Sequence, residues 1–452
     1  MVYCLARYYT AVLLSSGLAI IYGLMVNYHI TVLTMINRSA IRNEEGADIR
    51  IINSKNGLFS WSSTMQGLQI SAYFWGYLLG QLQGGRESEI YSPKWTMFFG
   101  VSLNVIFTLL TPMMSNIHAG AVVVGRVIEG IGGGVCFPAT HILLERWSPP
   151  EERGLMDMIT HAGTAAGITI FTLASGIIAA TIGWKRVFYI EGLLSIIWLI
   201  IWMFFITDFP EEQTFMSDKE RVFIIDSINE EEVNSGKSYL KVPWKDIFTS
   251  LPFWSIVIAH ACSNWGWYLI LTELPTYMKD VLNLDIKMNS FLSAIPYLSM
   301  LTFSIVLGGL IDLFLLIGIF TTTFGRKLAT FFASFIPCIC FALLCFITEP
   351  VYAVILMTIS ITCIGGMYSG FLSNHKDLSP NFAGTLLMIT NTIASVPGIA
   401  VPLLVGWLND QYPSIQLWRI VFCLTSLLYV VEFTVYLVFG SGNEQSWNKP
   451  SN

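Results

Sequence analysis

The chain has 452 residues, of which 54% are hydrophobic and only 12% are charged, and its formal net charge is −6. Soluble domains carry about 25% charged residues, so this composition excludes an ordinary soluble protein and indicates one that lies in a membrane. The sequence has neither a basic stripe nor an acidic tail, which argues against nucleic-acid binding.

Twelve stretches of the chain are long and apolar enough to cross a bilayer as helices, which takes about 20 mostly apolar residues. In chain order they are residues 10–35, 67–85, 95–115, 117–144, 155–180, 185–206, 252–278, 289–314, 328–347, 350–373, 382–408 and 416–439. The first stretch is longer than the apolar core of a signal peptide, about 7–15 residues, so we expect it to remain as the first span. The sequence thus predicts an all-α membrane protein with twelve transmembrane helices.

Two hydrophilic connections, residues 36–66 and 207–250, interrupt this pattern. An even number of spans puts both termini on one side of the membrane. If both termini are cytoplasmic, the cytoplasmic segments contain more Lys and Arg than the outer segments do. We therefore expect cytoplasmic termini. Asn37-Arg38-Ser39 is a glycosylation sequon in the loop that this topology puts outside, which makes Asn37 a candidate glycosylation site and the protein a candidate glycoprotein.

The two halves of the chain resemble each other, because short segments recur at a nearly constant offset. The matching pairs are Gly84-Gly85 with Gly308-Gly309, His141 with His375, Ser148-Pro149 with Ser379-Pro380, Met158-Ile159-Thr160 with Met388-Ile389-Thr390, Gly167 with Gly398, and Trp184–Phe188 with Trp418–Phe422. A repeat of six spans keeps its orientation, so the halves are predicted to be parallel repeats about an axis along the membrane normal.

These boundaries predict four parts of the chain. They are an N-terminal six-helix half at residues 1–206, a cytosolic linker at 207–250, a second six-helix half at 251–440 and a cytosolic tail at 441–452. Within the linker, Ser217-Asp218-Lys219-Glu220 is a capping box and predicts the start of a surface helix.

Motifs for covalent or metal chemistry are missing from the sequence. The eight cysteines lie almost all in apolar runs, and we interpret them as small buried hydrophobes rather than a disulfide framework. No CxxC pair, Cys/His metal spacing, nucleophile motif or HExxH occurs, so neither an enzyme nor a metal site is expected. No filter-like loop interrupts the spans, and a channel is therefore not supported.

Four blocks of sequence carry a family resemblance. They are Arg126–Gly130 continuing through Phe137–His141 to Trp147–Arg153; Leu274–Lys279; Asn374–Asp377 with Pro380, Ala383-Gly384 and Ile389–Thr392; and Phe74–Tyr77 with Gln81 and Gly84-Gly85. Together with the two-half architecture, they resemble the anion/cation symporter branch of the major facilitator superfamily. This branch, solute carrier family seventeen, includes sialin, the vesicular glutamate transporters and the type I sodium–phosphate cotransporters. The resemblance covers nearly the whole chain, and insect inorganic phosphate cotransporter-like members are similar in detail.

The chain departs from the family pattern at charged positions. The family arginine of the first span is replaced by Met25, and a second glutamate of the fourth span is replaced by Gly133. Glu87 stands where the family has an apolar residue after its paired glycines. Asp312 is followed by an apolar run, residues 313–320, where the family has a basic polar loop. The anion-binding and proton-coupling residues that the resemblance implies are thus only half present.

Charged residues inside a membrane cost at least about 2.5–3.5 kcal/mol each, so each needs a reason. Arg126 matches the family arginine of the fourth span, and its planar fork suits a carboxylate or phosphate. Glu129 is the candidate proton carrier, because a buried carboxylate can load and release a proton. The alternative is a structural ion pair between the two, since they are three residues apart on a helix.

Further candidates come from polar residues in the other spans. Glu273, beside an expected helix break at Leu274-Pro275, is a candidate for coupling-ion contact or else a solvated carboxylate at the extracellular edge. Candidate substrate contacts, with packing or an interfacial belt as the alternative for the aromatic ones, are Asn27, Tyr77, Asn264 and Tyr268. Candidate gating residues near the cytosolic ends of the spans are Glu89, Lys94, His141, Glu145, Arg153, His375 and Asp377.

The resemblance implies a secondary transporter, a proton- or sodium-coupled symporter of an organic anion or inorganic phosphate that works by alternating access. It implies no cofactor besides the coupling ion, H+ or Na+. Because Met25 and Gly133 replace family charges, an alternative function stays open. The protein would then be a divergent member of the family that moves a neutral or cationic solute, or a sensor or receptor that no longer transports. Expected partners are a small-molecule anion and the lipid bilayer, without nucleic acid. The oligomeric state is open, with a monomer as the default. The short segment before the first span lacks the acidic dileucine tail of lysosomal relatives, which favours the plasma membrane over a lysosomal or vesicular one.

Overall fold

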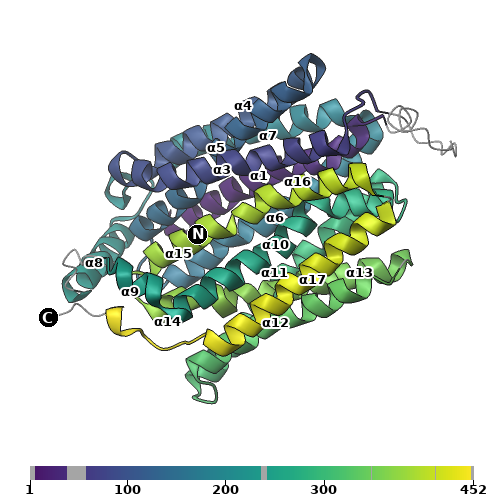
Figure 1. The fold of residues 1–452 in the computed structure, drawn as a ribbon. Coiled ribbons are helices and arrows are strands. Elements are labelled where there is room, and N and C mark those ends of the chain that lie inside the picture. The colour runs from purple at the N-terminus through teal and green to yellow at the C-terminus, as the bar shows by residue number, and fades with distance from the viewer. Residues whose placement is uncertain (1–5, 38–56, 236–241, 348, 413, 449–452) are drawn as a thin grey trace. The chain divides into compact units, whose positions relative to one another are not determined.

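The computed structural model describes residues 6–37, 57–235, 242–347, 349–412 and 414–448. Within these residues the regular structure is helical, and one isolated bridge between Ile36 and Phe59 is the only strand-like pairing (Figure 1). The chain divides into two compact units. The N-terminal unit comprises residues 1–61 and 68–239, and the C-terminal unit comprises residues 62–67 and 240–452.

The N-terminal unit contains six long helices and the helix of the linker. The long helices are α1 (Ala6–Met35), α3 (Ser63–Ile90), α4 (Pro93–Ile117), α5 (Ala119–Trp147), α6 (Arg153–Ile182) and α7 (Trp184–Phe205). A 3₁₀ turn, η1 (Pro210–Glu212), precedes the linker helix α8 (Asp218–Ser235). The predicted helix is present, and at its start the Ser217 hydroxyl accepts a hydrogen bond from the Glu220 backbone N–H at 3.3 Å. The Glu220 carboxylate binds Arg7 and the backbone N–H of Ala6, so the bonds shown are only half of a capping box.

The C-terminal unit begins with the short α9 (Trp244–Thr249) and then repeats the six-span pattern. Its long helices are α10 (Leu251–Asp280), α11 (Ile286–Leu316), α12 (Thr322–Leu344) and α17 (Ser414–Phe439). Its other two spans are interrupted. The first consists of α13 (Pro350–Ile364), η2 (Gly365–Met367), the π-helical η3 (Tyr368–Leu372) and α14 (Asn374–Leu378), and the second of α15 (Ala383–Ala394) and α16 (Val396–Gln411). A 3₁₀ turn, η4 (Ser446–Asn448), ends the described chain.

Ten of these spans are long and apolar enough to cross a membrane. The other two of the predicted twelve are α3 and α10, which have 28 and 30 residues but a more polar sequence. In both helices some of the polar side chains face inward: Gln69 and Ser71 of α3 and Ser263 and Thr272 of α10 are fully buried. Because these polar groups face protein rather than lipid, low hydropathy is compatible with a spanning helix.

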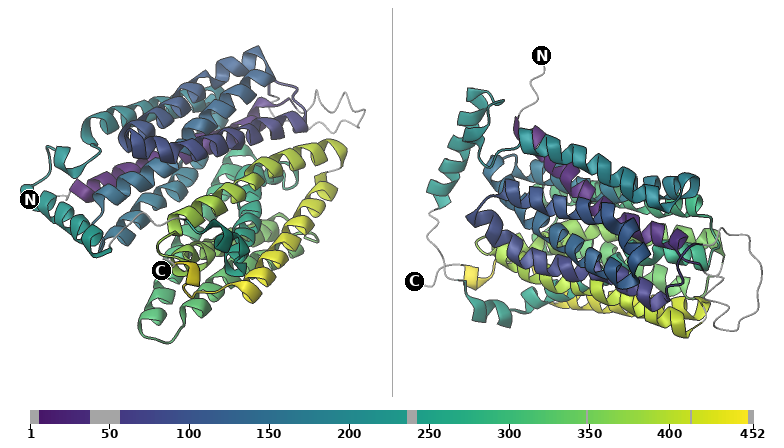
Figure 2. Two further views of the ribbon diagram at one scale, coloured as in Figure 1. Left: turned by 60° about the vertical axis from the view of Figure 1, so that its left-hand side comes forward. Right: turned by 90° about the horizontal axis from the view of Figure 1, so that it is seen from above.

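The packing within the two units follows the predicted repeat. In the N-terminal unit α1 packs on α6, and α4 packs on α5 and α7. In the C-terminal unit α10 packs on α15 and α16, and α12 packs on α13 and α17. Each pair of packed helices in one unit corresponds to a pair at the same positions in the chain order of the other unit. In each unit the long helices run along one another's length (Figures 1 and 2).

Glycines permit the closest helix contact in the N-terminal unit. A Cβ atom added at Gly76 of α3 would lie 1.8 Å from the Val127 carbonyl oxygen of α5, and one added at Gly130 of α5 would lie 1.9 Å from the Tyr73 carbonyl oxygen of α3. The two backbones therefore touch where these residues lack side chains. Small residues four apart are the usual means of close helix packing in lipid, and Gly80 and Gly134 continue the row.

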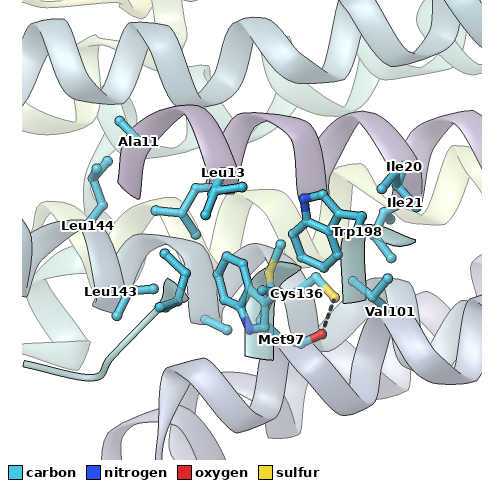
Figure 3. Close-up of a cluster of buried hydrophobic side chains, with 14 of the residues drawn as sticks. Ala11, Leu13, Ile20, Ile21, Met97, Val101, Cys136, Leu143, Leu144 and Trp198 are labelled. Atoms are coloured by element: carbon cyan, nitrogen blue, oxygen red, sulfur yellow. Dashed lines mark hydrogen bonds between the residues drawn. The ribbon is translucent and has the colours of Figure 1, made fainter. Parts of the chain in front are cut away.

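A layer of apolar side chains lies in the same unit between α1, α4, α5 and α7 (Figure 3). Trp198 and Trp202 of α7 stack with ring centroids 4.9 Å apart, and both are buried. The thiol of Cys136 points at the Met97 carbonyl oxygen, 3.9 Å away, as a dashed line shows in Figure 3. This cysteine behaves as the small hydrophobe that its apolar surroundings predict.

The seven described cysteines are free thiols, and Cys4 lies outside the described residues. Cys136, Cys262, Cys340 and Cys345 are buried, as expected, whereas Cys423 is exposed on α17. The prediction of burial was wrong for Cys423, because an apolar run does not say which helix face meets lipid. Its sulfur lies 3.1 Å from the sulfur of Cys345, longer than the 2.0 Å of a disulfide bond.

The structure corrects two local expectations. Helix α10 runs through Pro275 to Asp280, so the predicted break beside Glu273 is absent. The interruptions instead lie in the tenth span, where Gly370 leaves helical geometry with ψ −121°, and in the eleventh, between Ala394 and Val396. Helix α11 also continues to Leu316, two residues beyond the predicted end of that span, so the apolar run after Asp312 begins within the helix.

Candidate functional site

Arg126 lies in the interior of the N-terminal unit, where it is 2% exposed. Its Nη1 donates to Glu129 Oε2 at 2.8 Å, and its Nη2 donates to the Met25 carbonyl oxygen at 3.2 Å. The guanidinium carbon is 4.9 Å from the ring centroids of both Tyr28 and Tyr73, within the range of cation–π attraction. No described atom accepts a hydrogen bond from its Nε–H. The cation is thus held in place with one of its donors unused.

Glu129, one turn along α5, has partners on both carboxylate oxygens. Oε2 accepts from Arg126, and Oε1 accepts from the Thr108 hydroxyl at 3.3 Å. Asn104 of α4 donates to the Glu129 carbonyl oxygen at 2.9 Å and ties the two helices together at this level. The ion pair that the sequence suggested as the structural alternative is therefore present, and it leaves the proposed transport roles of the two residues untested.

The two positions at which this chain lacks a family charge both lie at this site. Met25 contributes only its carbonyl oxygen to Arg126, and its side chain is buried. A Cβ atom added at Gly133 would lie 2.1 Å from the Tyr73 hydroxyl oxygen, so this tyrosine occupies the space in which a side chain at residue 133 would begin. The second carboxylate of the family pattern is thus replaced by a neutral phenol.

Asn27, a predicted substrate contact, binds another residue of the protein. Its Nδ2 donates to Glu191 Oε2 at 2.9 Å, and the Ser175 hydroxyl donates to Glu191 Oε1 at 2.7 Å. Glu191 lies on α7 and is 2% exposed. This carboxylate was not predicted from the sequence, although a Glu within an apolar span is itself a signal of a buried polar site.

The remaining predicted substrate contacts are divided between the two units. Tyr77 of α3 stacks on Tyr73 with centroids 6.4 Å apart, which puts it beside the Arg126 site. Asn264 and Tyr268 lie on α10 in the C-terminal unit. Asn264 Nδ2 donates to the Ala394 carbonyl oxygen at 2.9 Å, at the interruption of the eleventh span, and Tyr268 is half-buried.

Glu273 is 4% exposed near the end of α10, where Thr272 and Thr276 are its neighbours on the same helix. The predicted alternative of a solvated edge carboxylate was wrong, because the side chain is buried among neutral groups. Its role in ion coupling stays a prediction.

The predicted gating pair Glu89 and Lys94 flanks the turn between α3 and α4. Glu89 is exposed, and Lys94 contributes its backbone N–H, which donates to Asp208 Oδ1 at 3.0 Å. The Ser92 hydroxyl donates to Asp208 Oδ2 at 2.6 Å. Asp208, which follows α7, therefore caps the start of α4 and was missed because it lies in the segment interpreted as linker.

Three other predicted gating residues lie where α5 ends and α6 begins. Glu145 is exposed, and Arg153 begins α6 and is half-buried. The His141 ring lies 5.0 Å from that of His161. His161 in turn pairs with Asp157 at 3.4 Å. The ligand atoms of His141, Asp157 and His161 all lie within 4.8 Å of one another, and imidazole and carboxylate groups of this kind could hold a zinc ion.

A network at the same end of the unit joins three elements that are distant in sequence. Arg7 Nε donates to Glu152 Oε2 at 2.7 Å and its Nη1 donates to Glu220 Oε1 at 3.2 Å. Glu220 also accepts from the backbone N–H of Ala6 at 3.0 Å and thereby caps α1. The Arg7 guanidinium holds the pKa of the Glu152 carboxyl below its usual range. Arg7 was not among the residues predicted to act at the site, whereas Glu152 lies in the block Trp147–Arg153 that carries the family resemblance.

In the C-terminal unit the two predicted gating residues have separate partners. Asp377 accepts from Arg326 Nε at 2.6 Å, an ion pair between α14 and α12. His375 is buried and uses one ring nitrogen with the Leu372 carbonyl oxygen and the other with the Thr390 hydroxyl, each at 2.8 Å. Asp377 therefore makes an ion pair, while His375 makes hydrogen bonds with a carbonyl oxygen and a hydroxyl.

Asn37 of the sequon is half-buried just after α1, and its backbone N–H donates to the Phe59 carbonyl oxygen at 2.7 Å. Arg38 and Ser39 lie outside the described residues, so glycosylation at Asn37 stays a prediction.

Comparison with known proteins agrees with this architecture. The profile of the Major Facilitator Superfamily matches residues 2–402. The chain is 35% identical to "Sialin" of Ovis aries, over 98% of this chain and 91% of that protein, and 33% identical to a "Putative inorganic phosphate cotransporter" of Drosophila melanogaster, over 98% and 86%. It is 29% identical to "Vesicular glutamate transporter 3" of Danio rerio, over 99% and 75%.

Solved structures show the same fold at low sequence identity. A bacterial homologue of the human lysosomal transporter Spinster superposes with a TM-score of 0.68 at 14% identity, covering 96% of each chain. A D-xylose–proton symporter superposes with a TM-score of 0.64 at 13% identity, covering 97% of this chain and 98% of that one. The chain is therefore a multi-pass membrane transporter, not an enzyme, and belongs to the major facilitator superfamily, in the solute carrier family that contains sialin, the vesicular glutamate transporters and the insect phosphate cotransporters.

Proposed function

We propose that the protein is a secondary active symporter that moves an organic anion or inorganic phosphate together with a proton or a sodium ion by alternating access. The observation that carries this proposal is the state of Arg126. It is a buried, permanently charged group with an unused Nε–H donor, and its one charged partner, Glu129, can be neutralised by a proton. An anion that reached the site would meet a guanidinium fixed between two aromatic rings.

The ion pair provides a direct means of coupling. While Glu129 is ionised, it competes with any anion for Arg126, because its Oε2 already lies 2.8 Å from Arg126 Nη1. Protonation of Glu129 removes that competitor and leaves the guanidinium fork for a carboxylate or phosphate. Proton binding and anion binding then favour each other, which is the linkage that a symporter needs. Glu273, among neutral hydroxyls, is a second site for the coupling ion.

The relatives agree with an anionic substrate, because two of them are named for glutamate and for phosphate. The test is uptake by the purified protein in proteoliposomes, with phosphate, glutamate and acidic sugars supplied under an imposed proton or sodium gradient. We expect Arg126→Gln to abolish uptake, and Arg126→Lys to restore little of it, because an ammonium group cannot form the bidentate fork. The matched control is Arg221→Gln on α8, where the ion pair with Asp218 is exposed. Uptake that survives Arg126→Gln contradicts the anion site.

Glu129→Gln separates coupling from binding. This variant lacks the competing charge, so we expect it to bind and exchange the anion between compartments of equal pH but to lose accumulation driven by a proton gradient. If a sodium gradient drives full accumulation in this variant, sodium is the coupling ion and Glu129 is not its carrier.

A second function is favoured by the replacements at Met25 and Gly133. With Tyr73 in place of the second carboxylate and one arginine fewer, the site is less charged than the family pattern, which suits a neutral or cationic solute, or a receptor that no longer transports. The same proteoliposomes should then take up none of the anions. Gain of phosphate or acidic-sugar uptake by Met25→Arg would indicate that the ancestral substrate was lost with that arginine.

The orientation and the membrane form the last part of the proposal. We infer cytoplasmic termini from the distribution of Lys and Arg, and the plasma membrane as the location. Labelling of cysteines introduced after Phe439 should require permeabilised cells, and surface biotinylation should recover the protein. Recovery only from intracellular vesicles contradicts the location without affecting the transport proposal.

A further inference from the structure

Helix α17 buries one continuous stripe of side chains in the C-terminal unit. Its members follow one another at intervals of three or four residues and are at most 2% exposed: Phe422, Thr425, Tyr429, Glu432 and Tyr436. The opposite face carries Leu427, Val430 and Leu437, which are 45–59% exposed. Such spacing puts the stripe on a single helix face. Glu432 is the one acidic residue in it.

The polar groups above and below Glu432 have hydrogen-bond partners on neighbouring elements. The Trp265 indole N–H of α10 donates to the Thr425 hydroxyl at 3.2 Å. Asn374, at the start of α14, donates to the Tyr436 hydroxyl at 2.8 Å. The interior around this stripe is therefore built to satisfy polar groups, which makes an unsatisfied group between them conspicuous.

Glu432 has no such partner. Its side chain is fully buried, and neither carboxylate oxygen accepts a hydrogen bond from any described atom. The Tyr429 hydroxyl, one turn away, is also without a described partner and lies against Gly266 of α10, where an added Cβ atom would come within 2.1 Å of it. Two unsatisfied oxygen-bearing groups thus lie together between α10 and α17.

None of the titratable groups around Glu432 can carry a positive charge, because they are thiols and a phenol. They are Cys262 on α10, Tyr429 on α17 itself and, beside Tyr429, Cys338 on α12. Arg326 of α12 is engaged by Asp377. Asp410, the one titratable residue of α16, precedes the start of α17 and so lies about 27 Å along the helix from Glu432. No described cation is placed to balance a negative charge on Glu432.

An ionised carboxylate without a cation or a protein hydrogen-bond donor is very costly to bury, whereas the neutral acid is buried at far lower cost. Glu432 also lies seven residues before the end of α17, about 10 Å along the helix axis from it. The carboxyl therefore carries a proton in this conformation.

We propose that Glu432 is a proton-binding site in the membrane interior of the C-terminal unit, which holds a proton in the conformation described here and exchanges it with water when the helices around it rearrange. In the loading step an O–H bond forms on Glu432 with a proton taken from water, and in the unloading step that bond breaks and the proton returns to water. The site is separate from Glu129 and Glu273. On the proposed function, this proton is one that the transport cycle carries.

Infrared spectroscopy of the full-length protein in lipid tests the proton site without a substrate. We expect Glu432→Gln to remove the carbonyl stretching band of a neutral carboxylic acid, and Glu349→Gln, the same change at an exposed position, to remove only carboxylate absorption. Transfer to heavy water should shift the Glu432 band as its proton exchanges. Loss of a carboxylate band in Glu432→Gln, or a band that never exchanges, overturns the proposal.

A transport assay on variants of Glu432 distinguishes a proton that is coupled to transport from one that only stabilises the fold. We expect Glu432→Gln, which mimics the neutral acid, to fold with unchanged melting temperature and to keep anion exchange at equal pH, but to accumulate several-fold less anion under a proton gradient. Glu432→Asp, which keeps a proton-binding group, should recover part of that accumulation. Full accumulation by Glu432→Gln overturns the coupled role. If wild-type protein transports no anion, the proposed function fails, while the infrared bands still decide the proton site.

Discussion

The Arg7 guanidinium lies between two carboxylates, with its Nε 2.7 Å from Glu152 Oε2 and its Nη1 3.2 Å from Glu220 Oε1. Glu152 directly precedes α6, and Glu220 lies in the first turn of α8. One side chain at the start of α1 therefore connects the first span, the fifth span and the linker helix. The linker helix is consequently a fixed part of the N-terminal unit.

Removal of this cation should destabilise the N-terminal unit. We expect Arg7→Met to lower the free energy of unfolding by about 2–3 kcal/mol, because it leaves the buried Glu220 carboxylate without its counterion. Thermal unfolding in detergent measures the effect. The control is Arg221→Met, whose ion pair with Asp218 is exposed and should be worth less than about 1 kcal/mol. Equal losses in the two variants would show that Arg7 is no more important than a surface charge.

The same cluster predicts a pH dependence. Arg7 lowers the pKa of Glu152 in the folded protein relative to its ordinary value near 4.3, so the unfolded state binds the proton more tightly. The stabilisation is fully present above that ordinary value and is lost as the pH falls through the lower folded pKa. We expect the melting temperature of the wild type to fall more steeply with acidification below about pH 4 than that of Glu152→Gln. Parallel curves for the two proteins would contradict this contribution.

The contact between α3 and α5 should not tolerate a methyl group. In Gly76→Ala the new Cβ atom would lie 1.8 Å from the Val127 carbonyl oxygen, and backbone cannot move aside as a flexible side chain can. We expect a loss of about 3 kcal/mol or failure to fold, measured by thermal unfolding and by size-exclusion profile. Gly154→Ala is the control, because no atom lies within 4 Å of its added Cβ, and it should change stability by less than about 1 kcal/mol. A stable Gly76→Ala would show that the two helices are farther apart.

Asn27 should be more important for stability than for substrate binding. Its amide donates to Glu191, so Asn27→Leu leaves a buried carboxyl with one donor fewer and should cost about 1–3 kcal/mol. Glu191→Gln, by contrast, keeps a side chain of the same shape that can still accept the Asn27 hydrogen bond. In a double-mutant cycle, Asn27→Leu should cost less in the Glu191→Leu background than in the wild type, because no unsatisfied oxygen remains there. A change in the KM of transport with unchanged stability would instead favour the substrate contact predicted from the sequence.

The sequence predicted several residues of the site, but it did not predict which of them contact one another across helices. Arg126 and Glu129 are separated by three residues on one helix, so the possibility of a pair followed from helix geometry alone. Their enclosure by Tyr28, Tyr73 and the Met25 carbonyl oxygen involves helices that are about 50 to 100 residues away, and no local pattern predicts which faces meet. Asn27 was assigned to substrate for the same reason, since its real partner lies 164 residues along the chain.

Other residues were missed because their local setting gave a weaker signal. Glu191 and Glu432 each lie in an apolar span, and only their burial without a cation distinguishes them from a carboxylate at a membrane boundary. Asp208 lies in a polar loop and caps α4 through bonds to the backbone and to a hydroxyl, contacts that composition does not mark.

The sequence by itself determined the membrane location, the number of spans and the twofold repeat, because a bilayer demands about 20 apolar residues per helix and that demand is local to each segment. Only the tertiary structure decided which charges are paired. Whether Arg126 is held by Glu129, Arg7 by Glu152 and Glu220, and Glu432 by nothing depends on distances between helices that are remote in sequence. Electrostatic and hydrogen-bond energies vary steeply over those distances, so a change of helix face by one residue would alter every pairing.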